Sequence, residues 1–169
     1  MKITQIRCYV FGLVLLGLLT GGCSRVVTVV ASDSICKKSV EVHLVGVNEM
    51  DKSRWESESM TDYWTPGNIL RKTAQEDGDM FVFQFGRGPC TFTLGKKDPI
   101  RRRWKNNKAR YLIVLADLPG VFTDKEGNDD VRRLILPDIK SKRWGLRVKQ
   151  INIEINENRI KAITVPKPD

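Results

Sequence analysis

The residue whose surroundings point most directly to chemistry is Cys23. Two glycines precede it, and before them residues 9–20 form an apolar run, YVFGLVLLGLLT. Two basic residues stand ahead of that run, which completes the three parts of a secretory signal. The sequence T-G-G-C resembles the lipobox, in which the cysteine thiol is diacylated and its amine is freed by cleavage. Residues 1–22 are therefore predicted to be a lipoprotein signal peptide, with lipidation at Cys23.

The length of the apolar run separates a signal peptide from a membrane span. The run has 12 residues, whereas a helix that crosses a hydrocarbon core of about 30 Å needs about 20. A plain signal with a chance cysteine is the alternative to a lipobox. Attachment through more than one acyl chain gives stable anchoring.

Ser24 follows the cysteine, in a place where Asp usually retains a lipoprotein at the inner membrane. The sequence therefore favours the outer membrane, with the domain on its periplasmic face.

Cys36 and Cys90 are the other cysteines of the predicted mature chain. An exported protein can form disulfides, and a Cys36–Cys90 bridge would close a long loop. Two buried free cysteines are the alternative. Two cysteines with one histidine have no metal-site spacing, so neither a metal nor another cofactor is expected.

Catalytic groupings are not evident in the sequence. His43 is the only histidine and lies in a predicted strand, where a half-exposed position is expected. Residues 124–130 (DKEGNDD) lack calcium-loop spacing and are predicted to be a solvated loop. D-L-P-G at residues 117–120 looks like a nucleotide switch, but the sequence has no phosphate-cradling G-x-x-x-x-G-K-[ST] loop. No catalytic residue and no enzyme is predicted, although a hydrolase with a dispersed carboxylate pair stays open.

Basic and aromatic residues gather just after Asp98-Pro99, a helix-start signal. On a helix, Ile100 and Trp104 are four residues apart and are predicted to face the core, leaving the three arginines outside. The segment could contact an anionic surface or an acidic partner, or it could be a solvated helix face. The residues of this predicted basic patch are Arg101, Arg102, Arg103, Lys105 and Lys108.

The charge of the predicted mature chain is also basic. Removing the signal leaves 27 of the 29 basic residues and all 20 acidic ones, a net charge of +7. In a cytosolic protein this excess would suggest nucleic acid as the partner. Predicted export argues against nucleic acid and favours lipid headgroups, cell-wall polymer or another protein.

Short strands dominate the rest of the chain. The alternation in residues 39–47 puts Val40, Val42 and Leu44 on one face. Residues 86–89 (GRGP) are a turn signal and predict a hairpin. Residues 51–73 have partly helical spacing and predict one or two short helices that cap a sheet edge. These elements predict a mainly β, two-sheet β-sandwich with short helical insertions. The predicted strands cover residues 25–31, 39–47, 80–85, 90–94, 110–118 (a central strand), 131–136, 149–155 and 159–165.

The order of these pieces resembles a known family. The lipobox is followed by S-V-E-V-H-L-V-G-V, a W-x(4)-M helical insert, A-R-Y-L-I-V-L-A-D-L, R-R-L-I-L-P and a closing I-N-I-E-I-N-E-N-R-I-K-A hairpin. This pattern over residues 26–164 is similar to that of the type VI secretion outer-membrane lipoproteins, the TssJ (SciN) family. The resemblance implies a transthyretin-like sandwich, which we expect over residues 23–165. The terminal residues 166–169 (PKPD) are expected to form a flexible tail.

The resemblance also implies a function and a contact site. The protein would be a structural component of the secretion membrane complex, anchored by lipid and docked onto the periplasmic domain of an inner-membrane subunit. Family members make that contact largely through the loop after the first strand. The corresponding residues here are Ser32, Asp33, Ser34, Lys37 and Lys38. A free-standing envelope lipoprotein that binds an anionic ligand or cell-wall polymer is the alternative.

Overall fold

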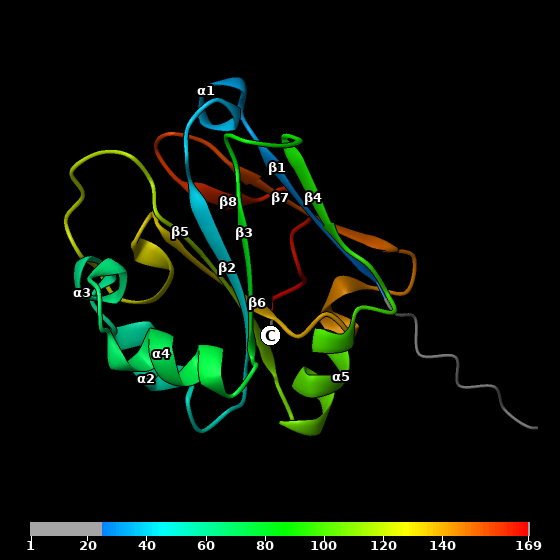
Figure 1. The fold of residues 1–169 in the computed structure, drawn as a ribbon. Coiled ribbons are helices and arrows are strands. Elements are labelled where there is room, and N and C mark those ends of the chain that lie inside the picture. The colour runs from blue at the N-terminus through cyan, green and yellow to red at the C-terminus, as the bar shows by residue number, and fades with distance from the viewer. Residues whose placement is uncertain (1–24, 169) are drawn as a thin grey trace, which may run out of the picture.

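The computed structural model describes residues 25–168. Residues 1–22, Cys23 and Ser24 lie outside the described residues. Within the described part, eight strands form two four-stranded sheets, with strand orders β4-β1-β7-β8 and β3-β2-β5-β6 (Figure 1). The prediction of a mainly β, two-sheet sandwich with short helical insertions is confirmed.

The strands are short, and helices occupy several of the connections between them. The strands are β1 (Val26–Ala31), β2 (Glu41–Val47), β3 (Met80–Gln84), β4 (Thr91–Leu94), β5 (Tyr111–Ala116), β6 (Arg133–Pro137), β7 (Gln150–Ile155) and β8 (Ile160–Ala162). The helices are α1 (Asp33–Cys36), α2 (Lys52–Ser57), α3 (Met60–Trp64), α4 (Ile69–Glu76) and α5 (Pro99–Asn106), and the 3-10 turns are η1 (Gly127–Asp129) and η2 (Lys142–Trp144). No helix in residues 25–168 combines the length and the apolarity that crossing a membrane requires.

The pairing of the strands explains why their sequences are so rich in β-branched residues. β1 lies inside its sheet, antiparallel to β4 and parallel to β7. β5 lies between β2 and β6, which confirms the predicted central strand. β7 and β8 form the predicted closing hairpin. β2 and β5 are covered on both faces, whereas the outward-facing Val30 of β1 is exposed. Val and Ile fit the pleated, buried faces of all these strands.

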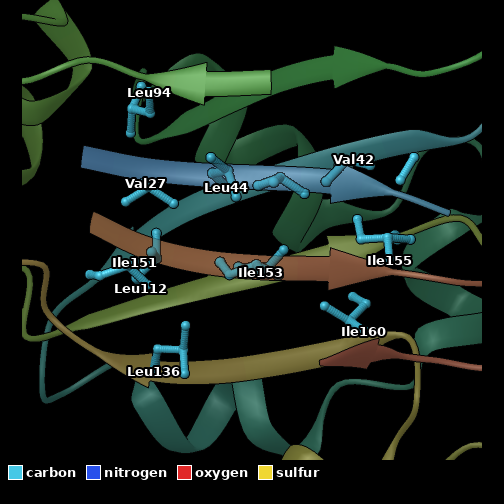
Figure 2. Packing of buried hydrophobic residues seen from close by; sticks show 14 of the residues in the cluster. Val27, Val42, Leu44, Leu94, Leu112, Leu136, Ile151, Ile153, Ile155 and Ile160 are labelled. Carbon is cyan, nitrogen blue, oxygen red and sulfur yellow. The ribbon is translucent and has the colours of Figure 1, made fainter. Parts of the chain in front are cut away.

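The main core fills the space between the two sheets. Figure 2 shows Val27 of β1 and Ile153 of β7 on one side, with Val42 and Leu44 of β2 on the other. All four are fully buried. The predicted alternation in β2 is therefore correct, since its even-numbered valine and leucine residues face the opposite sheet.

A second apolar cluster lies on the outer face of the β3-β2-β5-β6 sheet. Trp55, Met60 and Tyr63 from the helical segment pack there against Val45 of β2 and Ile113 of β5. The prediction that helices would cap a sheet edge is thus wrong: α2, α3 and α4 cover a sheet face (Figure 1). The reason is that the outward residues of β2 and β5 are themselves apolar and need a cover.

The predicted hairpin around residues 86–90 is also wrong. β3 and β4 both form, but β3 pairs with β2 in one sheet and β4 pairs with β1 in the other. The connection crosses between the sheets, so the two strands face each other. The rings of Phe83 and Phe92 accordingly stack with their centroids 4.2 Å apart.

Helix α5 begins where the sequence predicted it. The Asp98 side chain accepts a hydrogen bond from the Ile100 N–H (3.1 Å), and Pro99 occupies the first turn. Trp104 packs directly on the backbone of Gly46, where a Cβ atom would lie 2.3 Å from the indole ring. The prediction that all three arginines would face outward is wrong for Arg101, which is buried. Arg101 is three residues before Trp104 and therefore shares its face of the helix.

Candidate functional site

Three chain connections meet at the end of the sandwich where β1 finishes. They are residues 32–38 after β1, residues 86–90 between β3 and β4, and residues 156–159 between β7 and β8. Because β1 runs parallel to β7 and β2 antiparallel to β3, all three leave the sheets at the same end. We call these three segments together the distal loop cluster. Helix α1 forms its tip (Figure 1).

Hydrogen bonds and an ion pair join the segments of the distal loop cluster. The Ala31 N–H donates to the Cys90 carbonyl (2.8 Å), and the Ser32 N–H donates to the Ile155 carbonyl (2.9 Å). The Lys38 ammonium lies 2.5 Å from a carboxylate oxygen of Glu157. This contact holds the pKa of Glu157 below its ordinary value. The ion pair is exposed and adds little stability, but it links residues 32–38 to residues 156–159.

A disulfide fixes two of the three segments covalently. Cys36 at the end of α1 is bonded to Cys90, with the Cα atoms 5.0 Å apart. The sequence had left this pairing open. Close by, Gly86 adopts a positive φ of 95°, and a Cβ atom there would lie 2.6 Å from the Lys38 carbonyl oxygen. The chain can pass this tightly only with glycine at the turn.

The residues predicted to contact a partner lie at the tip of this cluster. The expected loop contains one helical turn, α1, in which the Ile35 N–H donates to the Ser32 hydroxyl. Ile35 is fully buried and anchors the turn to the main core. The remaining residues named from the sequence are exposed: Asp33, Ser34, Lys37 and Lys38. An anchored turn presents these side chains in one arrangement, which lowers the entropy cost of binding.

The basic patch lies at the opposite end, beside the start of β1. The Arg101 guanidinium donates to the carbonyl of Arg25, the residue before that strand (2.7 Å). The other basic residues of the segment are exposed: Arg102, Arg103, Lys105 and Lys108. Six residues of β1 separate the two regions, a span of about 20 Å. The two predicted sites are therefore distinct surfaces.

His43 is buried, so the half-exposed position predicted for it is wrong. Its Nδ1 lies 2.6 Å from the Tyr63 hydroxyl and its Nε2 lies 2.6 Å from a Glu41 oxygen, which Arg71 also contacts at 2.7 Å. Burial lowers the pKa of His43, and burial raises the pKa of Tyr63. Trp64 covers the imidazole, with ring centroids 4.8 Å apart. A substrate cannot reach this ring, so the network fastens α3 and α4 onto β2.

The acidic loop over residues 124–130 is largely exposed, as the sequence predicted, with Asp130 as the exception. Asp130 is buried and accepts hydrogen bonds from the Arg132 side chain and backbone. Burial alone would raise the pKa of Asp130, but these bonds hold it below the ordinary value. Asp124 contacts Arg132 and also bonds Ser59 and Thr61 at the start of α3. Both carboxylates therefore stabilise the fold.

The D-L-P-G segment ends a strand. The Asp117 N–H donates to the Glu41 carbonyl (3.0 Å), and Leu118 is buried in the main core. Burial raises the pKa of the Asp117 carboxyl. In the part of the chain that the structure describes, no three His, Cys, Asp or Glu side chains are placed to hold a metal ion.

The distal loop cluster contains residues that sequence reasoning did not assign to the site. Residues 86–90 were interpreted as a hairpin turn, and residues 156–159 only as the turn before a last strand. The two cysteines were the signal that could have joined residues 86–90 to α1. For residues 156–159 the only clue was the expected β7–β8 hairpin, which does not say what lies beside it.

Comparison with known proteins gives one informative likeness. Neither a protein-family model nor a curated protein matches the sequence. Among solved structures, the fold is similar to that of Serratia marcescens Lip, described as a membrane bound component of the Type VI Secretion System. The TM-score is 0.51 at 12% sequence identity, and the match covers 83% of this chain and 96% of Lip. The resemblance predicted from the sequence is thus matched in the fold.

Proposed function

We propose that this chain is a lipid-anchored structural component of a type VI secretion membrane complex, of the TssJ (SciN) kind. The observation that carries the proposal is the likeness of the fold to Lip over 83% of the chain. The lipobox-like sequence ending at Cys23 supports anchoring through lipid, and Ser24 supports the outer membrane, on its periplasmic face. The domain acts by binding other proteins and has no catalytic role.

The two ends of β1 give the domain a direction relative to the membrane. Cys23 is two residues before Arg25, so its Cα atom lies at most about 7.6 Å from that of Arg25. The end of the sandwich with Arg25 must then sit close to the lipid. The distal loop cluster is at the other end of β1 and faces away from the outer membrane. That orientation suits contact with the periplasmic domain of an inner-membrane subunit.

The chemistry of the distal loop cluster suits a protein partner with an acidic face. Its exposed cations include Lys37, Arg87 and Arg159, whereas Asp33 and Glu157 are its exposed acids. Glu157 is already paired with Lys38. The free charges are therefore mostly positive, and charge complementarity would steer the encounter.

The anchoring part of the proposal is tested with Cys23→Ser. The variant is expected in the soluble periplasmic fraction, while the wild-type chain stays with outer membrane. Persistence of the variant in the outer-membrane fraction would refute the lipid anchor.

The docking part is tested by photo-crosslinking in cells. A crosslinking residue replaces exposed Ser34 in the distal loop cluster or, as the control, exposed Lys72 on α4. We expect Ser34 to capture an inner-membrane protein with a periplasmic domain, encoded beside type VI genes, and Lys72 to capture none. Equal capture from both positions, or none from Ser34, would contradict docking through the distal loop cluster.

A further inference from the structure

A basic cavity lies between α5 and the segment that follows β6. It has a volume of about 270 Å³ and is partly open to solvent, and Trp104 and Ile139 are among its apolar walls. A shallower hollow continues from it over Lys97 and Arg102. The cavity's charged lining has five cations and one carboxylate: Arg101, Lys105, Lys108, Arg110, Lys140 and Asp138. Such a cluster of positive charge around a partly open cavity favours an anion.

Arg101 is the feature that distinguishes this cavity from an ordinary basic surface. The residue is only 8% exposed. Its Nη1 donates to the carbonyls of Arg25 (2.7 Å) and Gly95 (3.2 Å), while its Nη2 has no hydrogen-bond partner among the described residues. Both acceptors are neutral, so they hold the guanidinium without neutralising it. Burial lowers the pKa of Arg101, while the nearby carboxylates of Asp138 and Asp98 act in the opposite direction.

The one carboxylate of the cavity does not satisfy this guanidinium. Asp138 accepts hydrogen bonds from the backbone N–H groups of Ile139 and Lys140, and burial raises its pKa. Its nearby charge offsets part of the positive field. Nη2 is itself closed off from solvent, so a bound anion would feel the charge of Arg101 from within the cavity and would take its hydrogen bonds from the exposed ammonium groups of Lys105 and Lys140.

The position of the cavity decides what kind of anion it meets. Arg101 bonds the residue at which the described chain begins, and Arg25 in turn donates to the Ile139 carbonyl on the cavity wall (2.9 Å). On the proposed function, this end of the domain lies against the lipid. The anionic groups available there at high local concentration are the phosphates of lipid headgroups.

We propose that this cavity binds the phosphate of an anionic phospholipid headgroup, with Arg101 as a buried charge beneath the phosphate and Lys105 and Lys140 as donors at its rim. The inference rests on the proposed membrane anchoring. Headgroup binding fixes the tilt of the domain, so that the distal loop cluster points away from the bilayer.

Vesicle flotation of a chain that begins at Ser24 tests the proposal without the lipid anchor. Both hydrophobic clusters lie within residues 25–168, so this chain keeps the whole described core. At 0.15 M salt we expect it to float with phosphatidylcholine vesicles that contain phosphatidylglycerol. Lys105→Gln with Lys140→Gln should weaken binding about thirty-fold, since each lysine near an anionic surface contributes about five-fold.

A matched control removes the same charge elsewhere. Lys72→Gln with Lys161→Gln neutralises two exposed lysines on α4 and β8 and should change vesicle binding less than two-fold. If both double variants weaken vesicle binding equally, the domain is attracted by its overall positive charge and the cavity is not the binding site. If neither the wild type nor any variant floats, the headgroup site is refuted, while the Cys23 anchor and the docking proposal are untouched because this chain tests neither.

Nuclear magnetic resonance identifies the bound group. The indole N–H of Trp104, which lines the cavity, should shift on adding dihexanoyl-phosphatidylglycerol, and the indole of Trp55 on the far cluster should not. Inorganic phosphate should compete for the same site with lower affinity. Binding of inorganic phosphate without any lipid binding would overturn the assignment to a headgroup. Lys105→Gln with Lys140→Gln should greatly reduce the Trp104 shift in a chain whose other resonances stay in place.

Discussion

The disulfide between Cys36 and Cys90 gives the most quantitative prediction. Replacing both residues by serine frees two loops that the bridge joins across 54 residues of sequence. The chain-entropy relation for a loop of that length predicts a loss of about 4 kcal/mol in the free energy of unfolding. Native contacts beside the bridge, such as the hydrogen bond from the Ala31 N–H to the Cys90 carbonyl, do not involve the sulfur atoms. The loss therefore arises mainly in the unfolded chain.

Urea unfolding measures this loss directly. The chain beginning at Ser24 contains four tryptophans, and their fluorescence reports the transition. A loss of about 4 kcal/mol is a large part of the 5–15 kcal/mol typical of a domain, and it should lower the urea midpoint by about 2 M. Dithiothreitol should reproduce the effect in the wild type and change nothing in the double variant. A loss below about 1 kcal/mol would refute the view that the bridge constrains this fold.

Three further changes test packing and charge. Gly46→Ala places a Cβ atom against the Trp104 ring and should lower the free energy of unfolding by about 1–3 kcal/mol, measured by thermal melting. Because burial lowers the pKa of His43 below 6.5, the unfolded chain binds the proton better. Stability should therefore fall as the pH drops through 6.5, by at most about 1.4 kcal/mol per unit, and His43→Gln should flatten that slope in urea titrations. Arg132→Met leaves Asp130 buried without its ion pair and should cost about 3–5 kcal/mol by the same measurement.

Each of these changes has a control and an outcome that contradicts it. Gly88→Ala meets no atom within 4 Å and should leave the melting temperature unchanged; an equal loss at both glycines would contradict the packing argument. The chain has a single histidine, so an unchanged pH slope in His43→Gln would assign the dependence to carboxyl groups. Lys125→Met, on the same exposed loop, should cost nothing measurable.

Most strands were predictable because the side chains on one face of a strand share one environment, either core or solvent, and this produces a two-residue alternation in the sequence. In β7 the three isoleucines alternate with polar residues, and all three are fully buried. The same rule could not predict the partner of a strand. Gly86 and its neighbours indicate a change of direction, but a turn within one sheet and a crossing between sheets have the same turn residues. Only the pairing of β4 with β1, far away in sequence, separates the two.

The errors at Arg101 and His43 have a common physical origin. Both were assigned to outward faces by a local period, and both faces turned out to be covered by distant elements. His43 lies under Tyr63 and Trp64 of α3, twenty residues later. Arg101 lies against the residue before β1, 76 residues earlier. Periodicity tells which residues share a face, but whether that face meets solvent depends on tertiary packing.

Buried arginines also change what the net charge of the chain means. The Arg133 guanidinium of β6 donates to four backbone carbonyls, those of Trp55, Glu58, Lys125 and Gly127. These bonds hold α2 and the acidic loop against β6. Arg25 likewise bonds two carbonyls, and Arg132 is neutralised by Asp130 and Asp124. Arg25, Arg132 and Arg133 therefore hold loops in place and do not attract a partner. Arg101 has the same construction and, like Arg25, has one nitrogen without a partner among the described residues, but Arg101 also lines a cavity. A long-range attraction for acidic surfaces must therefore come from the exposed lysines and arginines, whereas the buried charge of Arg101 acts at short range inside the cavity. Raising the salt concentration should weaken the first and largely spare the second.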